Sequence, residues 1–319
     1  MKKIFINLKR FEVPRLFGGV SDHREPEEWA AYIIEGCARL GLGELADMPV
    51  IFFFPEALLL TARRVLKAQP CEKVKNMALG CQGVFREDLS GAPGGNFGAF
   101  TTHRPATAMR ILGSAWTIIG HSEERREKLE LIARFAPQVE KDGDPQLAGR
   151  AKAVVDTVMN EEVKAALQAG LQVLLCVGET VEEKGEGSAA AQRKRVRQVL
   201  RRQLVKGLAG IGSRPVVIAY EPVWAIGPGK VPPGGEYIGF VSAYIKEVVK
   251  AEFGYIPEVV YGGGLKKENA GEIGGVPTID GGLVALTRFS GDIGFHPEDL
   301  RDIIQAFRQG AGIGMSGPV

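Results

Sequence analysis

The sequence predicts a (β/α)8 barrel, a closed ring of eight parallel strands with a helix after each strand. Short apolar runs alternate with longer helical patterns along the chain, which is typical of βαβ units and a parallel sheet. An open doubly wound sheet is the main alternative, but no GxGxxG pattern follows the first apolar run. The runs that predict the eight strands are residues 3–8, 49–54, 77–82, 115–120, 172–177, 215–220, 257–262 and 279–285.

Helical patterns fill the intervals between these runs. The clearest cover residues 26–41, 161–170, 189–210 and 297–307. We expect residues 127–156 to be an insertion after the fourth strand and the loop after the eighth strand to be extended by residues 290–295. A length of 319 residues fits one large α/β domain or two ordinary ones, and no linker divides the chain. We therefore expect a single domain over residues 1–319.

Composition narrows the class of protein. The net charge of +2 gives no strong field for nucleic acid or an acidic membrane, and no aromatic residue interleaves with the charges of the basic helix at 193–202. The four cysteines contain no CxxC pair, which argues against a zinc site or a disulfide framework and fits a reducing compartment. No stretch is long enough to span a bilayer. We expect a cytoplasmic protein with no nucleic-acid or membrane partner.

Polar residues stand where several predicted strands end. In such a barrel the carboxyl ends of the strands meet at one mouth, where reactive side chains gather. Each residue alone has an ordinary explanation, such as a surface lysine, a structural histidine or a packed cysteine, so their convergence is the signal. They are Asn7 and Lys9 after the first strand, His121 after the fourth, Cys176 in the fifth and Glu221 after the sixth.

This set of side chains suits proton transfer beside a carbonyl group. A carboxylate such as Glu221 can carry a proton between adjacent carbons, an imidazole such as His121 can polarise the carbonyl oxygen, and the ammonium of Lys9 can stabilise the enediolate. The segment after Glu221, PVWAIGPGK, combines stiff and glycine-rich parts and suits a lid that excludes water. This chemistry needs no metal and no organic cofactor, so we expect neither.

Five motifs resemble those of the triosephosphate isomerase family: INLK at 6–9, GHSEERR at 120–126, CVGET at 176–180, AYEPVWAIGPGK at 219–230 and YGGG at 261–264. The resemblance implies a TIM barrel in which Glu221 is the base and His121 a neutral electrophile, a division of roles already known for this family. It also implies that Lys9 is the cation of the substrate site. Asn7 would orient Lys9 or the substrate, and Glu123 would anchor the local ion pairs.

The resemblance further implies a homodimer and a phosphate cradle of backbone N–H groups after strands six, seven and eight. Thr101 would interdigitate with the partner, although Thr102 and His103 depart from the family pattern there. The cradle would consist of Gly227, Gly263, Gly264, Ala285 and Leu286.

The phosphate end also departs from the family. Ala285 and Leu286 replace a usual pair of glycines, and their Cβ atoms obstruct close approach of a phosphate. Arg288 could compensate, because a guanidinium grips phosphate with two hydrogen bonds. In the lid, Pro228 and Pro232 would stiffen the closing segment.

Three functions remain open from the sequence. The first is interconversion of glyceraldehyde-3-phosphate and dihydroxyacetone phosphate. The second is isomerisation of another phosphosugar, such as a tetrulose phosphate, because the proton-transfer residues are present while the phosphate grip is changed. The third is a barrel that binds a metabolite without turnover.

Overall fold

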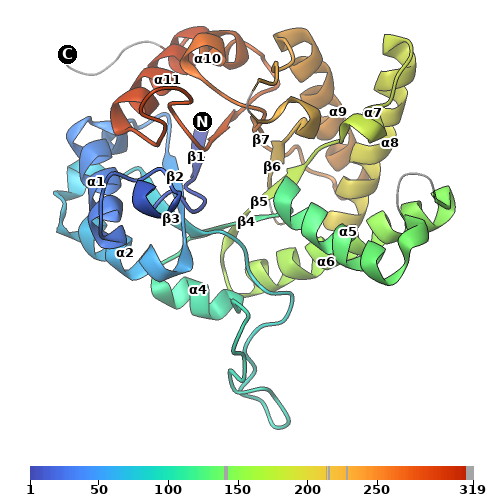
Figure 1. Ribbon diagram of the computed structural model, residues 1–319, viewed down its shortest axis with the longest axis horizontal. Helices are drawn as coiled ribbons and strands as arrows, with labels where there is room; N and C mark the ends of the chain where they lie inside the picture. The colour runs from blue at the N-terminus through green and yellow to red at the C-terminus, as the bar shows by residue number, and fades with distance from the viewer. Residues whose placement is uncertain (140–142, 213, 215, 228, 314–319) are drawn as a thin grey trace.

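The computed structural model describes residues 1–139, 143–212, 214, 216–227 and 229–313. Within them, parallel strands close into a barrel in the order β1 to β8, and helices surround it (Figure 1). The strands are β1 Lys3–Asn7, β2 Val50–Phe54, β3 Met77–Cys81, β4 Trp116–Ile119, β5 Gln172–Val177, β6 Val217–Tyr220, β7 Val259–Tyr261 and β8 Gly281–Val284. The helices are α1 Pro26–Arg39, α2 Leu59–Ala68, α3 Cys71–Val74, α4 Ala106–Leu112, α5 Ser122–Phe135, α6 Pro145–Gln168, α7 Val181–Lys184, α8 Ala189–Gly207, α9 Gly235–Phe253, α10 Lys267–Gly274 and α11 Pro297–Gly310.

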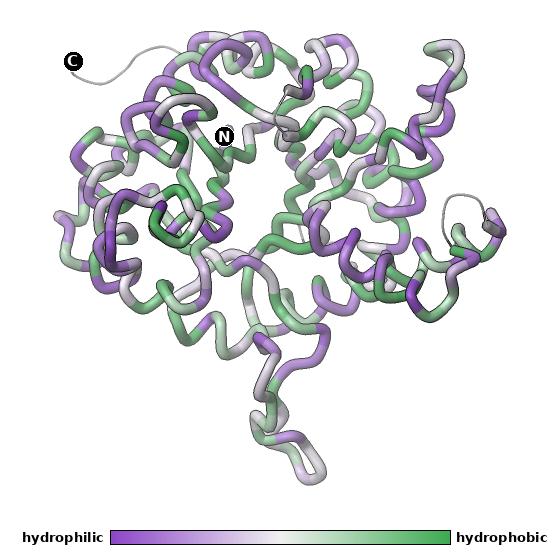
Figure 2. Tube along the Cα trace, viewed as in Figure 1, coloured by the Kyte–Doolittle hydropathy of each residue, from purple (hydrophilic) through white to green (hydrophobic). Residues whose placement is uncertain are grey.

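The predicted (β/α)8 barrel is confirmed, and each strand lies within the run that predicted it. The ring closes because β1 pairs with both β2 and β8, with Ile4 opposite Val50 on one side and Gly282 on the other. The strands are apolar on both faces, and Figure 2 shows them mainly green around the centre of the molecule. This two-sided burial is the reason that the sequence shows continuous apolar runs instead of an alternation.

Two apolar layers hold the barrel together. Alternate strand residues point inward, where the Phe5 ring lies edge-on to Trp116 with centroids 5.1 Å apart and stacks with Phe53 at 5.9 Å. Cys176 belongs to this interior layer and is fully buried. The remaining strand residues face the helices and form the larger outer layer of the core.

The described part of residues 127–156 extends two helices away from the barrel. It comprises the C-terminal part of α5, a short 3-10 helix at Pro137–Val139 and the first half of α6 (Figure 1). The prediction of a helix over 161–170 placed its start too late, because α6 begins at Pro145. Asp144 caps that start by accepting hydrogen bonds from the backbone N–H groups of Gln146 and Leu147.

The long connection after β8 folds back on itself. Arg288 and Gly294 form an antiparallel bridge, and Arg15 from the loop after β1 donates to Ile293 O at 3.0 Å and pairs with Asp292. The loops after β1 and β8 are therefore joined beside the mouth of the barrel.

No helix in these described ranges is both long enough and apolar enough to cross a membrane.

Candidate functional site

The side chains of Glu221 and His121 meet at the mouth of the barrel. Glu221 follows β6, and its side chain is almost fully buried. Its Oε1 lies 3.3 Å from His121 Nε2, and its Oε2 accepts a hydrogen bond from the backbone N–H of Ser122 at 3.1 Å. A carboxylate and an imidazole from different strands thus share one site, held by the start of α5.

The backbone around His121 determines which ring nitrogen carries the proton. His121 is the N-cap of α5, and its Nδ1 accepts from the backbone N–H of Glu123 at 3.4 Å. In a neutral imidazole the proton then lies on Nε2, the nitrogen that faces Glu221. A neutral imidazole with Nε2–H directed into the mouth can donate a hydrogen bond to an oxygen of a bound carbonyl.

Lys9 and Asn7 join this group from β1. Lys9 Nζ lies 2.5 Å from Glu123 Oε1, and Glu123 Oε2 lies 3.9 Å from His121 Nδ1. The ion pair with Lys9 contributes to a pKa of Glu123 below its usual value, although burial acts in the opposite direction. The contacts therefore form a continuous series from Lys9 through Glu123 and His121 to Glu221.

The backbone of Lys9 has an unusual conformation that Asn7 supports. Lys9 has a φ of 43°, a left-handed value that is uncommon outside glycine, and its N–H donates to Asn7 Oδ1 at 3.1 Å. Gln82, at the end of β3, donates to Lys9 O at 2.9 Å and to Phe53 O at 3.1 Å. A strained residue that neighbouring groups hold in place is a common feature of functional sites.

Glu179 holds the first part of the proposed lid in place through Trp224, a role that the sequence did not reveal. Its Oε1 accepts from Trp224 Nε1 at 2.7 Å and from the hydroxyls of Tyr220 and Tyr237 at 3.0 Å each. Burial raises the pKa of Glu179, and these three donors act against that rise. The sequence signal was its place after β5, but its partners come from β6, the lid and α9.

The segment proposed as a lid begins with Pro222 and a 3-10 helix at Val223–Ala225. Lys184 Nζ lies 3.4 Å from the centroid of the Trp224 ring, which adds a cation–π contact to the hydrogen bond with Glu179. Gly227 has a φ of +116°, a conformation that glycine adopts without strain. Pro228 lies outside the described residues.

Four of the residues predicted to bind phosphate lie in the loops after β7 and β8. At Gly263 an added Cβ would lie 2.4 Å from the Tyr261 hydroxyl and 2.6 Å from Pro222 Cγ, so only glycine fits. Gly264 has a φ of +90°, and Ala285 and Leu286 are half-buried in the loop after β8.

The guanidinium of Arg288, at this end of the barrel, is engaged in an ion pair. It forms two hydrogen bonds of 3.1 Å with Asp299 at the start of α11, and these bonds raise the pKa of its guanidinium. Lys266 lies over the Phe289 ring at 4.3 Å, and Lys267 pairs with Asp302 at 2.8 Å.

Cys176 is no nucleophile in this arrangement. Burial, and next the charge of Glu221, raise the pKa of its thiol well above the usual value. The side chain lies in the barrel interior, close enough to the Glu221 carboxylate to be affected by its charge.

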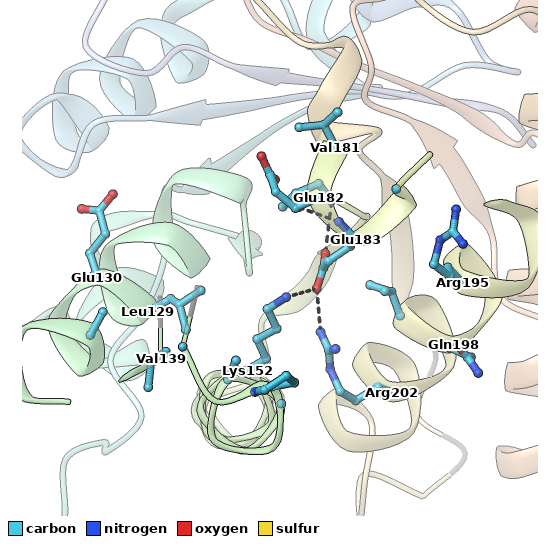
Figure 3. Close-up of a pocket in the computed structure, with 18 of the residues that line it drawn as sticks. Leu129, Glu130, Val139, Lys152, Val181, Glu182, Glu183, Arg195, Gln198 and Arg202 are labelled. Atoms are coloured by element: carbon cyan, nitrogen blue, oxygen red, sulfur yellow. Dashed lines mark hydrogen bonds and ion pairs between the residues drawn. The ribbon is translucent and has the colours of Figure 1, made fainter. Parts of the chain in front are cut away.

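A groove of about 1420 Å³ lies on the flank of the molecule, between α5–α6 and α7–α8. Figure 3 shows Glu183 in it, pointing toward Lys152 and Arg202. Glu183 Oε1 lies 3.0 Å from Lys152 Nζ and 3.6 Å from Arg202 Nη2, and Arg202 also pairs with Asp156 at 2.8 Å, so both cations are engaged in ion pairs. None of the proton-transfer residues lines the groove.

Comparisons with known proteins identify a matching family and similar proteins. The family model for triosephosphate isomerase matches residues 50–306, which include His121 and Glu221 but not Asn7 and Lys9. The chain is 34% identical over 232 residues to the triosephosphate isomerase of Chloroherpeton thalassium, covering 72% of this chain and 75% of that protein. It is 33% identical over 256 residues to that of Alkaliphilus metalliredigens, covering 78% and 85%.

A solved structure is similar over nearly the whole chain. The crystal structure of triosephosphate isomerase from Bartonella henselae matches with a TM-score of 0.64 and covers 96% of this chain and 99% of that one. At 24% sequence identity this likeness shows the barrel fold.

Proposed function

Because the chain belongs to the triosephosphate isomerase family, we propose that it interconverts glyceraldehyde-3-phosphate and dihydroxyacetone phosphate. The enzyme is an isomerase of the intramolecular oxidoreductase class. The observation that carries the mechanism is the 3.3 Å approach of Glu221 Oε1 to His121 Nε2 inside a buried mouth. A base and a donor at this spacing can act on two neighbouring positions of one small substrate.

The reaction divides among this chain's residues as follows. Glu221 removes a proton from the carbon beside the carbonyl and returns it to the adjacent carbon. His121 donates its Nε2–H to the developing oxyanion, and Lys9 stabilises the negative charge of the enediolate. Asn7 holds the backbone of Lys9, Glu123 pairs with Lys9, and Cys176 packs behind Glu221.

A coupled assay with glyceraldehyde-3-phosphate tests this function. We expect turnover without added metal or cofactor. If the enzyme turned over a four-carbon ketose phosphate and no triose phosphate, the substrate assignment would be wrong. If a triose phosphate bound without exchange of its carbon-bound proton with solvent, the barrel would be a binding protein.

The proposed phosphate site lies in the loops after β6, β7 and β8. We place it at Gly227, Gly263, Gly264, Ala285 and Leu286, with Arg288 as an added cation. In support, Arg288 lies on the loop after β8 and the side chain of Asp299 fixes its guanidinium. An immobilised guanidinium loses little entropy on binding an anion.

Replacement of Arg288 by alanine should raise KM for the triose phosphate about tenfold and leave kcat nearly unchanged, because a hydrogen bond to a charged group is worth about 1.5–3 kcal/mol. Arg301→Ala is the matched control, since Arg301 is also half-exposed and paired with an aspartate, Asp302, in α11. A KM for Arg288→Ala within twofold of the control would mean that backbone groups alone bind the phosphate.

The remaining proposals concern assembly and location. A homodimer is supported by the loop after β3, which extends away from the barrel in Figure 1 and exposes Phe97. Sedimentation of the assayed sample at the mass of one chain would contradict it. We also propose that the chain forms one domain with an insertion at 127–156 and that the protein is cytoplasmic.

A further inference from the structure

The two peptide units on either side of Gly120, the residue before His121, are held by two side chains from the first turn of α5. The buried N–H of Gly120 donates to Glu124 Oε2 at 2.7 Å, and Gly120 O accepts from Arg125 Nε at 2.8 Å. Gly120 has a φ of +75°, so the strand does not continue through it in an extended conformation. Side chains, and not strand pairing, therefore fix the direction in which the backbone enters His121.

The two clamping residues have different surroundings. Arg125 also donates to Cys176 O at 2.9 Å and pairs with Asp156 at 2.7 Å, so it ties β5 and α6 to the start of α5. The carboxylate of Glu124, in turn, is the hydrogen-bond acceptor for the Gly120 N–H. Loss of Glu124 would leave a buried donor without a partner and a glycine free to rotate.

Charges from α5 and α6 fix Glu124 itself. Lys128 Nζ lies 2.8 Å from Glu124 Oε1 and 3.4 Å from Glu162 Oε1, and Glu162 is almost fully buried. Burial, and next the charge of Glu124, raise the pKa of Glu162 above its usual value. Burial would raise the pKa of Glu124 too, but Lys128 and the hydrogen-bond donors hold it below its usual value.

We propose that Glu124 is a positioning residue for His121: its carboxylate fixes the Gly120 peptide and thereby the imidazole ring against Glu221. The ring lies 3.3 Å from Glu221, and a shift of about 1 Å in a catalytic group can cost about a hundredfold in rate. The proposal rests on the proposed function, because isomerisation is what gives the position of His121 its importance.

Three variants test this role. Glu124→Ala removes the acceptor, Glu124→Gln keeps an oxygen for the Gly120 N–H, and Glu130→Ala breaks only the surface pair with Arg126 on the same helix. We expect kcat to fall about 10- to 100-fold in Glu124→Ala with KM within threefold of wild type. Glu124→Gln should stay within threefold of the wild-type kcat, and Glu130→Ala should equal wild type.

Measurements of thermal unfolding distinguish a loss of positioning from a loss of folded protein. Each kcat is measured well below the Tm of that variant, so that the enzyme in the assay is folded. If Glu124→Ala lowered Tm but kept kcat within twofold of wild type, Glu124 would be structural only. If Glu124→Gln lost as much kcat as Glu124→Ala, the hydrogen bond to Gly120 would not be the cause. Either result overturns the proposal.

NMR of the His121 ring gives a readout that does not depend on turnover. The ring ¹⁵N shifts should change in Glu124→Ala and match wild type in Glu124→Gln and Glu130→Ala. If the wild type did not isomerise triose phosphates, the proposed function would fail while these shifts still tested the positioning. Unchanged shifts in Glu124→Ala would overturn the positioning even in an active enzyme.

Discussion

Replacement of Glu221 by glutamine should lower kcat for triose phosphate isomerisation by about a thousandfold, because a positioned general base contributes about 10²–10⁴ in rate. Glutamine matches the shape of glutamate and can still accept from the Ser122 N–H, which lies 3.1 Å away. It cannot take a proton from carbon at neutral pH. We therefore expect a folded enzyme with nearly normal KM, measured in the coupled assay.

Glu186→Gln is the matched control for this loss of charge. Glu186 is exposed and lies between α7 and α8, outside the mouth of the barrel. Its kcat should equal that of wild type. If Glu221→Gln kept more than a tenth of the wild-type kcat, another group would be the base.

Replacement of Gly178 by alanine should destabilise the protein by about 3 kcal/mol and also reduce kcat. A Cβ at Gly178 would lie 1.7 Å from Glu221 O and 2.6 Å from Glu221 C. Both are backbone atoms, so the end of β5 or of β6 must move, and overpacking of this kind costs about 1–3 kcal/mol or more. The displaced group is the backbone of the base, so the activity of the folded protein should fall as well. Differential scanning calorimetry and the coupled assay measure the two effects.

Gly149→Ala is the matched control, because it adds the same methyl group at a glycine that has open space around it. Gly149 lies inside α6, and nothing is within 4 Å of its added Cβ. Alanine in a helix is favoured over glycine by about 0.5–1 kcal/mol, so this variant should be slightly more stable than wild type. Equal Tm values for the Gly178 and Gly149 variants would refute the clash.

Much of the fold could be predicted because hydrophobic periodicity is local. A strand buried on both faces, such as Val50–Phe54, appears in the sequence as an unbroken apolar run. Its boundaries shifted by one or two residues, since the end of a strand depends on pairing with its neighbours. The start of α6 was predicted too late, although Asp144 and Pro145 form a good helix start.

The site could be predicted only in part. His121 and Glu221 lie within two residues of the ends of β4 and β6, and in a closed barrel that position alone brings them to one mouth. Glu179 and Glu124 were not recognised, because their partners become neighbours only in the folded chain. The hydrogen bond between Trp224 and Glu179 joins residues 45 positions apart, and no local pattern encodes it.

The sequence by itself determined the barrel and the kinds of groups at its mouth: a carboxylate, an imidazole and an ammonium at the ends of buried strands. Tertiary structure decided their geometry and their electrostatics. Lys9 pairs with Glu123, which lies 114 positions away in the chain. The close packing at Gly178 and the raised pKa of Glu162 both follow from which elements lie side by side. The physical reason is that apolar burial acts on each segment separately, whereas hydrogen bonds and charge pairs depend on distances that only ring closure sets.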